Sequence, residues 1–142
     1  MEYADKRYTF LHDLNFILNY CKHFRLYLAL CNDDSFVKES HNIILNEYNK
    51  SVQWLSFPSD NRFLFSFLEN NIDCSKVTIV NGLKDNLNID TVLATMNVIR
   101  ETFYKFNLPI ILWVDEYIMG RFIRVAPDFY NCSGSITLIG LT

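Results

Sequence analysis

Residues 108–129, LPIILWVDEYIMGRFIRVAPDF, decide the fold of this 142-residue chain. The apolar run at residues 110–114 is short and β-rich, which is typical of a strand buried on both faces of a parallel sheet. Asp115 and Glu116 follow at once and suit an N-cap and the acidic first turn of a helix. Apolar residues then recur at helical spacing until Pro127, which is expected to end the helix; they are Tyr117, Ile118, Phe122, Ile123 and Ala126. The stretch therefore predicts a strand, a turn at its carboxyl end and a helix that returns over the sheet.

The rest of the chain alternates between helical and strand-like patterns. Helices are expected at residues 5–23, 36–49 and 89–106, and strands at residues 25–31, 52–57, 76–80 and 135–141. Residues 61–71 fit either an alternating strand or a short buried helix, and Asp60 or Asn61 as a cap favours the helix. Because strand–helix alternation gives right-handed crossovers that cover a sheet, we expect one α/β domain over residues 1–142. It would have three layers, with a mainly parallel five-stranded sheet between helices.

The composition is that of a globular domain. Apolar residues make up 50% and aromatic residues 15%, well above the content of a disordered chain. The formal net charge of −3 argues against an overall basic surface for nucleic acid. No apolar run approaches the roughly 20 residues of a membrane span, and residues 1–5 are acidic and polar where a secretion signal is basic and then apolar. We therefore expect a cytoplasmic protein whose partners are neither nucleic acid nor membrane.

The cysteines and histidines follow no disulfide or metal-binding pattern. No two cysteines form a Cys-x-x-Cys pair, and without a secretion signal we expect reduced, mostly buried thiols. A zinc site would need scattered residues to meet through folding alone, so none is expected. The residues concerned are Cys21, Cys31, Cys74, Cys132, His12, His23 and His41.

Three segments together resemble a known family. They are LYLALCND at residues 26–33, VTIVNGLKD at residues 77–85 and the stretch at residues 108–129, whose Ala-Pro-Asp-Phe ending is the most specific part. The chain resembles the degenerate nucleoside-triphosphatase-like domain at the N-terminus of many bacterial tetratricopeptide-repeat and signalling proteins, described as inactive relatives of the STAND ATPases. The resemblance implies a P-loop NTPase-like topology without catalysis or cofactor, and a role in binding proteins, with self-association as one form of it.

The chain departs from the family in two places. Relatives follow the Ala-Pro-Asp-Phe motif with a Trp- and Arg-containing segment, where this chain has YNCSG at residues 130–134. Relatives also continue into repeats or an effector module, whereas the sequence stops at Thr142. The chain is therefore expected to be either a solitary version of the domain or one excised from a longer protein.

The segments that hold the nucleotide in a working P-loop enzyme have lost the residues that do so. Residues 31–40, CNDDSFVKES, contain no glycine where GxxxxGK[ST] is needed to wrap the phosphates. The loop, which includes Asn32, instead places Asp33 and Asp34 at the helix N-terminus, and Lys38 with Ser40 is the only remnant. At the Walker B place, Asn81 stands where a magnesium-binding Asp is expected, with Asp85 further on. Asn81-Gly82 reads more simply as a turn with one residue at positive φ. A domain that senses nucleotide without hydrolysing it remains an alternative.

Asp115 and Glu116 are the best catalytic candidates, because ligands of doubly wound sheets bind at the carboxyl ends of strands. Adjacent carboxylates there could hold a metal or act as general acid and base in a hydrolase or nuclease. Lys76 and Asp73 are conceivable partners for such a site. Helix capping explains the two acids more simply, so we expect a protein that is not an enzyme.

The remaining polar and aromatic groups suggest a surface for a partner. Arg121 and Arg124 lie one turn apart on the expected helix and suit a solvated face. Arg121 could form an ion pair there with Glu116. Tyr117, Arg121 and Arg124 are therefore a candidate contact face. The other aromatic residues that stand out, Trp54, Trp113, Phe63, Phe65 and Phe67, are expected in the core. The expected function is that of a non-catalytic interaction module in a bacterial signalling or defence assembly.

Overall fold

Five parallel strands form one sheet in the computed structural model, which describes residues 3–131 and 136–141. The strands lie in the order β2-β3-β4-β1-β5 and every neighbouring pair is parallel. Their bounds are Arg25–Leu30 (β1), Val52–Ser56 (β2), Val77–Asn81 (β3), Pro109–Val114 (β4) and Ile136–Gly140 (β5). The α/β class and the five-stranded sheet expected from the sequence are thus confirmed.

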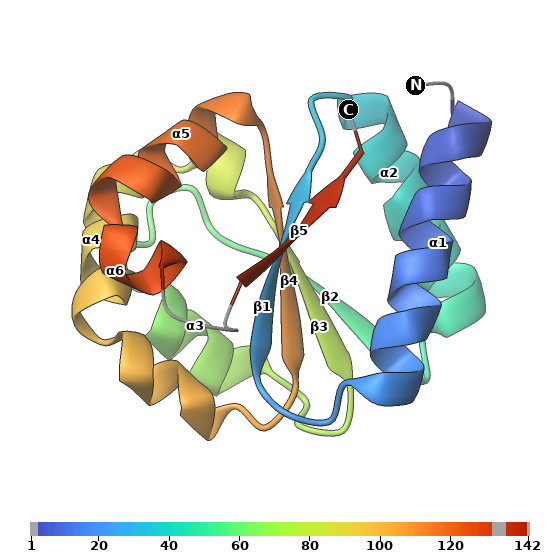
Figure 1. Ribbon diagram of the computed structural model, residues 1–142, viewed down its shortest axis with the longest axis horizontal. Helices are drawn as coiled ribbons and strands as arrows, with labels where there is room; N and C mark the ends of the chain where they lie inside the picture. The colour runs from blue at the N-terminus through green and yellow to red at the C-terminus, as the bar shows by residue number, and fades with distance from the viewer. Residues whose placement is uncertain (1–2, 132–135, 142) are drawn as a thin grey trace.

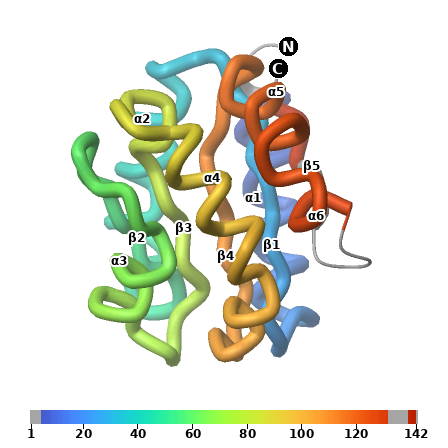
Figure 2. Tube along the Cα trace, turned by 90° about the vertical axis from the view of Figure 1, so that its left-hand side faces the viewer, coloured from blue at the N-terminus to red at the C-terminus, as the bar shows by residue number. Residues whose placement is uncertain are grey.

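Helices cover both faces of the sheet (Figure 1). Helices α1 (Tyr3–Tyr20) and α2 (Asp34–Ile43) lie on one face, and α2 continues as a π-helical turn, η1 (Ile44–Tyr48). On the other face lie α3 (Leu64–Asn71), α4 (Ile89–Val98), α5 (Glu116–Val125) and α6 (Pro127–Tyr130), which Figure 2 shows from outside. The described residues also form two 3₁₀ helices: η2 (Leu83–Asp85) follows β3, and η3 (Arg100–Lys105) follows α4.

Strand β4 explains why the domain has two cores. All six of its residues are buried, and alternate side chains point to opposite faces of the sheet. Ile110 and Leu112 pack into the core under α3–α6, whereas Ile111 and Trp113 pack into the core under α1 and α2. Each large apolar side chain buried in this way stabilises the fold by about 1.5–3 kcal/mol. The predicted strand buried on both faces is therefore correct.

The order of the strands creates a crevice at their carboxyl ends. From β1 the chain crosses by α2 to the far edge strand β2, over one face of the sheet. From β4 it crosses by α5 and α6 to the opposite edge strand β5, over the other face. Because the neighbours β1 and β4 send the chain to opposite faces, their loops diverge, and such a switch point is where open α/β sheets bind ligands.

Several boundaries and buried faces differ from the sequence-based expectation. The helix expected at residues 89–106 is interrupted at Ile99, whose φ of −104° and ψ of 22° end α4. The chain continues as η3, which brings Phe103 fully into the core. In α5 the predicted inward residues Tyr117 and Ile123 are 63% and 45% exposed, because the apolar arc is wider than the surface that the helix buries. Phe63 precedes α3 and is likewise exposed.

Candidate functional site

A cavity of about 230 Å³ lies at the switch point between β1 and β4. The structure brings together there the predicted site residues Asp34, Lys38, Asn81, Asp85 and Asp115. Cys31, Lys84 and Trp113 also line the cavity, although the sequence did not single them out as site residues. The loops after β1, β3 and β4 therefore meet in one place, which we call the crevice.

The N-terminus of α2 is occupied by the chain's own carboxylate. Asp33 Oδ1 accepts hydrogen bonds from the Ser35 and Phe36 amides at 3.1 and 3.3 Å and from the Ser35 hydroxyl at 2.7 Å. Asp33 Oδ2 accepts from Lys6 Nζ at 3.1 Å. The Ser35 hydroxyl, and after it the Lys6 ammonium and the Phe36 amide, lower the pKa of Asp33 to about 2. The amide groups that would cradle a phosphate are thus engaged by Asp33.

The N-terminus of α5 is occupied in the same way. Asp115 Oδ1 accepts from the Ile118 amide at 2.8 Å, which confirms the predicted N-cap. The Glu116 amide donates to Asn32 Oδ1 at 3.0 Å. This bond joins the loop after β1 to the helix after β4, across 84 positions of sequence. The Asn32 side chain therefore ties together the two loops that diverge at the switch point.

A salt bridge spans the other side of the crevice. Lys84 Nζ donates to both carboxylate oxygens of Asp34 at 2.9 Å. The hydrogen bond to Asp34 raises the pKa of Lys84. Because the Asp34 side chain is 70% exposed, solvent screens the pair and its contribution to stability is small. The bridge nevertheless holds α2 against η2 and neutralises one of the crevice's two lysines.

The turn after β3 follows the prediction made from Asn81-Gly82. Gly82 has a φ of +105°, the one positive value among the described residues. A Cβ at this position would lie 2.5 Å from the carbonyl oxygen of Phe57. The neighbouring backbone is also joined by a hydrogen bond, from the Phe57 amide to the Asn81 carbonyl at 2.7 Å. This turn directs η2, and with it Lys84 and Asp85, toward the crevice.

Some residues considered in the sequence do not take the predicted positions. The Ser40 hydroxyl is buried inside α2 and donates to the Phe36 carbonyl at 2.9 Å, so it faces no phosphate site. Arg121 forms two hydrogen bonds of 2.9 Å with Asp90 on α4, and not an ion pair with Glu116. Arg124 is exposed on α5 and does not line the crevice.

The conceivable second half of a nuclease site lies elsewhere. Lys76 and Asp73 form a 4.0 Å ion pair immediately before β3, at the amino end of the sheet. Asp115 follows β4 at the carboxyl end, so the two pairs of charged residues are separated by the length of the strands. Lys76 and Asp73 therefore cannot complete a catalytic site with Asp115 and Glu116.

The metal-binding residue types do not gather in the described part of the chain. Within residues 3–131 and 136–141, no group of three or more His, Cys, Asp or Glu side chains is placed to hold a metal ion. Cys21, Cys31 and Cys74 are free thiols. Cys31 is buried, Cys21 is half-buried and Cys74 is exposed, so the expectation of mostly buried thiols is wrong for Cys74. Cys132 lies outside the described residues.

The crevice differs from a ligand cradle in both charge and size. Its lining has three carboxylates, Asp34, Asp85 and Asp115, and two ammonium groups, Lys38 and Lys84. Its volume is below the ~300–1,000 Å³ of most small-molecule sites. The sequence signal that could have identified Lys84 is its place in the loop directly after a buried strand. Asn32 also follows a buried strand, but its bond to the Glu116 amide could not be predicted, because that partner is 84 positions away in sequence.

Comparison with protein-family models, curated proteins and solved structures found no match to this chain. None of the helices in the described part of the chain combines the length and the apolar character needed to cross a membrane.

Proposed function

We propose that this chain is a non-catalytic protein-interaction and regulatory module of a bacterial signalling or defence assembly, with an NTPase-like fold that lacks a working Walker A loop. The observation that carries the proposal is that the chain's own side chains engage the N-termini of both helices that begin at the crevice. Asp33 and Asp115 cap the two helices that point into it, and Asn32 accepts the Glu116 amide. The fold keeps the position of a nucleotide site while its own side chains take the phosphate's place.

Electrostatics support the absence of triphosphate chemistry. A phosphate site needs free amide donors at a helix N-terminus and an excess of positive charge. Here Asp33 and Asp34 bring negative charge to the N-terminus of α2, and Lys84 is paired with Asp34. Lys38 is the remaining cation in the lining, which also contains Asp85 and Asp115. A triphosphate would be repelled at the place where a working enzyme attracts it.

The three segments that resemble the inactive STAND relatives also support the proposal by their placement. They contribute β1, β3 and β4, the three adjacent inner strands of the sheet. Each segment ends in a loop that lines the crevice. The resemblance therefore lies in the part of the fold where an NTPase would carry its chemistry.

A hydrolase or nuclease built on Asp115 and Glu116 receives less support. Asp115 is engaged as a helix cap, and the Glu116 side chain is exposed to solvent. Lys76 and Asp73, the conceivable partners, lie at the other end of the sheet. The two acids are thus explained by the start of α5.

Calorimetric titration of the purified chain with ATP and with GTP, in the presence of magnesium, tests the proposal. We expect no saturable heat at millimolar nucleotide. Saturable binding would overturn the proposal and make the chain a nucleotide sensor or an enzyme. The Asp33→Asn and Asp34→Asn double variant is the matched comparison, because it removes the two charges at α2 while Asn can still cap a helix.

A further inference from the structure

Helix α1 exposes aromatic rings along its whole outer side. Tyr8, His12, Phe16 and Tyr20 follow one another at intervals of four residues and are all exposed. We call these four residues the aromatic row. Tyr8 and Tyr20 are 70% and 72% exposed and Phe16 is 54% exposed. The buried side of the helix is formed by other residues, Phe10, Leu14 and Ile17, so the row is not needed for the core.

The rings of the row contact one another. Tyr8 stacks on His12 with ring centroids 5.7 Å apart, and Phe16 lies against Tyr20 at 5.0 Å. Residues four apart lie on the same side of a helix. The row covers three such intervals and is therefore about 18 Å long. Two pairs of exposed rings on one side of a helix are a candidate contact surface.

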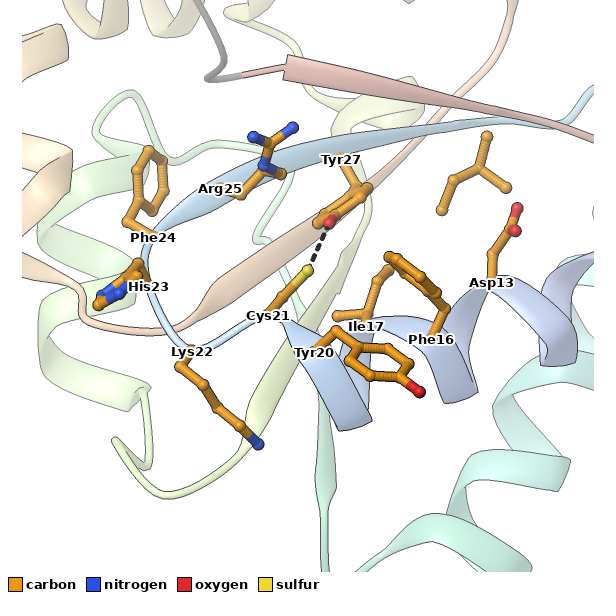
Figure 3. A pocket seen from close by; sticks show the side chains of 11 residues that line it. Asp13, Phe16, Ile17, Tyr20, Cys21, Lys22, His23, Phe24, Arg25 and Tyr27 are labelled. Carbon is orange, nitrogen blue, oxygen red and sulfur yellow. Dashed lines mark hydrogen bonds between the residues drawn. The ribbon is translucent and has the colours of Figure 1, made fainter.

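A cavity adjoins the carboxyl end of the row. Its volume is about 640 Å³, within the range of binding pockets. Phe16 and Tyr20 of α1 and Tyr27 of β1 line it (Figure 3). Ile139 of β5 also belongs to the lining. The Tyr27 hydroxyl lies 2.9 Å from Cys21 Sγ at its inner end. The cavity thus offers an aromatic and aliphatic lining with a few polar atoms, which suits a large apolar side chain.

The charge around the cavity is the reverse of the charge of the whole chain. Lys22, His23 and Arg25 line it, against the single acid Asp13. Lys6 and Arg7 on α1 are paired with Asp33 and Glu39. The excess at the cavity is therefore that of Lys22 and Arg25 over Asp13, whereas the whole chain has 13 basic and 16 acidic residues. An acidic segment is therefore favoured at this place on a molecule whose net charge is negative.

We propose that the aromatic row and the adjoining cavity form the docking surface for an acidic amphipathic segment of a partner protein, which inserts one large apolar side chain into the cavity. The inference rests on the proposed function and names the chemistry of the partner. A small molecule would fill the cavity and leave Tyr8 and His12, at the far end of the row, uncovered. A segment laid along α1 covers the row and the cavity together.

A second copy of the chain fits this surface less well. A two-fold interface centred on the cavity would place Lys22 and Arg25 of one copy opposite the same residues of the other. Like charges placed opposite one another across an interface oppose association. The partner is therefore a protein of different sequence, with acidic residues beside its anchor.

The test is selection of random peptides, displayed as a library, against the full chain. We expect the enriched peptides to be acidic and to carry a Trp, Phe or Leu anchor. Their affinity should fall at least about tenfold for Phe16→Ala or Tyr20→Ala. It should also fall for Lys22→Glu. The matched controls are Tyr117→Ala and Lys105→Glu, which change an exposed ring and an exposed lysine on the other face of the sheet and should leave affinity unchanged.

Three results would overturn this inference. The first is a set of enriched peptides without acidic character, and the second is binding that responds to Tyr117→Ala and not to Phe16→Ala. The third is a wild-type dimer that Phe16→Ala converts to a monomer, since the occupant would then be a second copy. Peptides that dock around Tyr117 would leave the proposed function intact, whereas nucleotide binding in the calorimeter would overturn that function alone. All five substituted positions are exposed, so equal melting temperatures will show that each variant is folded.

Discussion

At the scale of single residues, Gly82 is the position where the backbone permits the least change. We expect Gly82→Ala to destabilise the fold by at least about 1–2 kcal/mol, because an L-residue is strained at a φ of +105°. The added Cβ would also clash with the Phe57 carbonyl. Urea unfolding of the variant measures the loss as a lower midpoint at an unchanged slope.

Gly120→Ala is the control for that measurement. Gly120 lies within α5, and a Cβ added there meets no atom within 4 Å. Replacing a helical glycine by alanine stabilises a protein by up to about 1 kcal/mol. The two variants should therefore shift the midpoint in opposite directions. Equal shifts would mean that the turn after β3 is not held as described.

Asp33 makes stability depend on pH in a defined range. Its pKa is lowered to about 2 in the folded chain, from about 3.9 when unfolded. A lowered carboxyl pKa contributes stability that is fully present above the unfolded value and is lost as pH falls through the folded value. Asp33→Asn keeps a capping acceptor but removes the charge that faces Lys6. The wild-type chain should therefore melt above the variant at neutral pH, and the difference should close between pH about 4 and about 2. A difference that stays constant over that range would contradict the role given to the ionised Asp33.

At the scale of elements, the sequence predicts type and order better than orientation. The strand at β4 and the helix after Asp115 followed from an apolar run and a cap, which are local signals. The outward turn of Tyr117 and Ile123 could not be predicted, because it depends on how much of α5 the sheet and α4 cover. The pairing of Arg121 with Asp90 was missed for a related reason, since its partner belongs to another helix.

The orientation of α5 can be tested with two neighbouring residues that the apolar pattern treats alike. Phe122 is fully buried, so Phe122→Ala should lower the free energy of unfolding by about 3–5 kcal/mol. Ile123 is 45% exposed, so Ile123→Ala should cost roughly 1 kcal/mol or less. The free energy of unfolding, measured for each variant, shows whether the two residues differ in burial. Similar costs would restore the sequence-based expectation that both residues face the core.

At the scale of the whole molecule, the place of the site was predictable and its internal contacts were not. The carboxyl ends of parallel strands lie at one edge of the sheet. The loops after β1, β3 and β4 could therefore be predicted to lie close together. The bonds from Lys84 to Asp34 and from Glu116 to Asn32 join residues 50 and 84 positions apart. Sequence patterns of short period carry no information at that range. The caps by Asp33 and Asp115 follow from local signals, whereas the contacts that join the loops are visible only in the folded chain.

Thiol labelling tests the packing of the whole molecule. In a Cys132→Ser background, Cys74 should react first because it is exposed, and half-buried Cys21, which contacts the Tyr27 hydroxyl, should follow. Cys31 should react last, because it is buried and burial raises its pKa, which lowers its thiolate fraction. Mass spectrometry of timed samples gives the order. Early labelling of Cys31 would show that the crevice opens in solution.

The pairing of β1 also has a consequence for folding during synthesis on the ribosome. This apolar strand is made before the other four strands of the sheet, yet its two neighbours are β4 and β5, the last two to be made. Leu30 meets its partner Val114 only after 83 intervening residues have been translated. Pairing over such separations is slow and leaves apolar strands open to wrong partners. The nascent polypeptide must therefore keep β1 shielded, by α1 or by a chaperone, while most of the domain is still being synthesised.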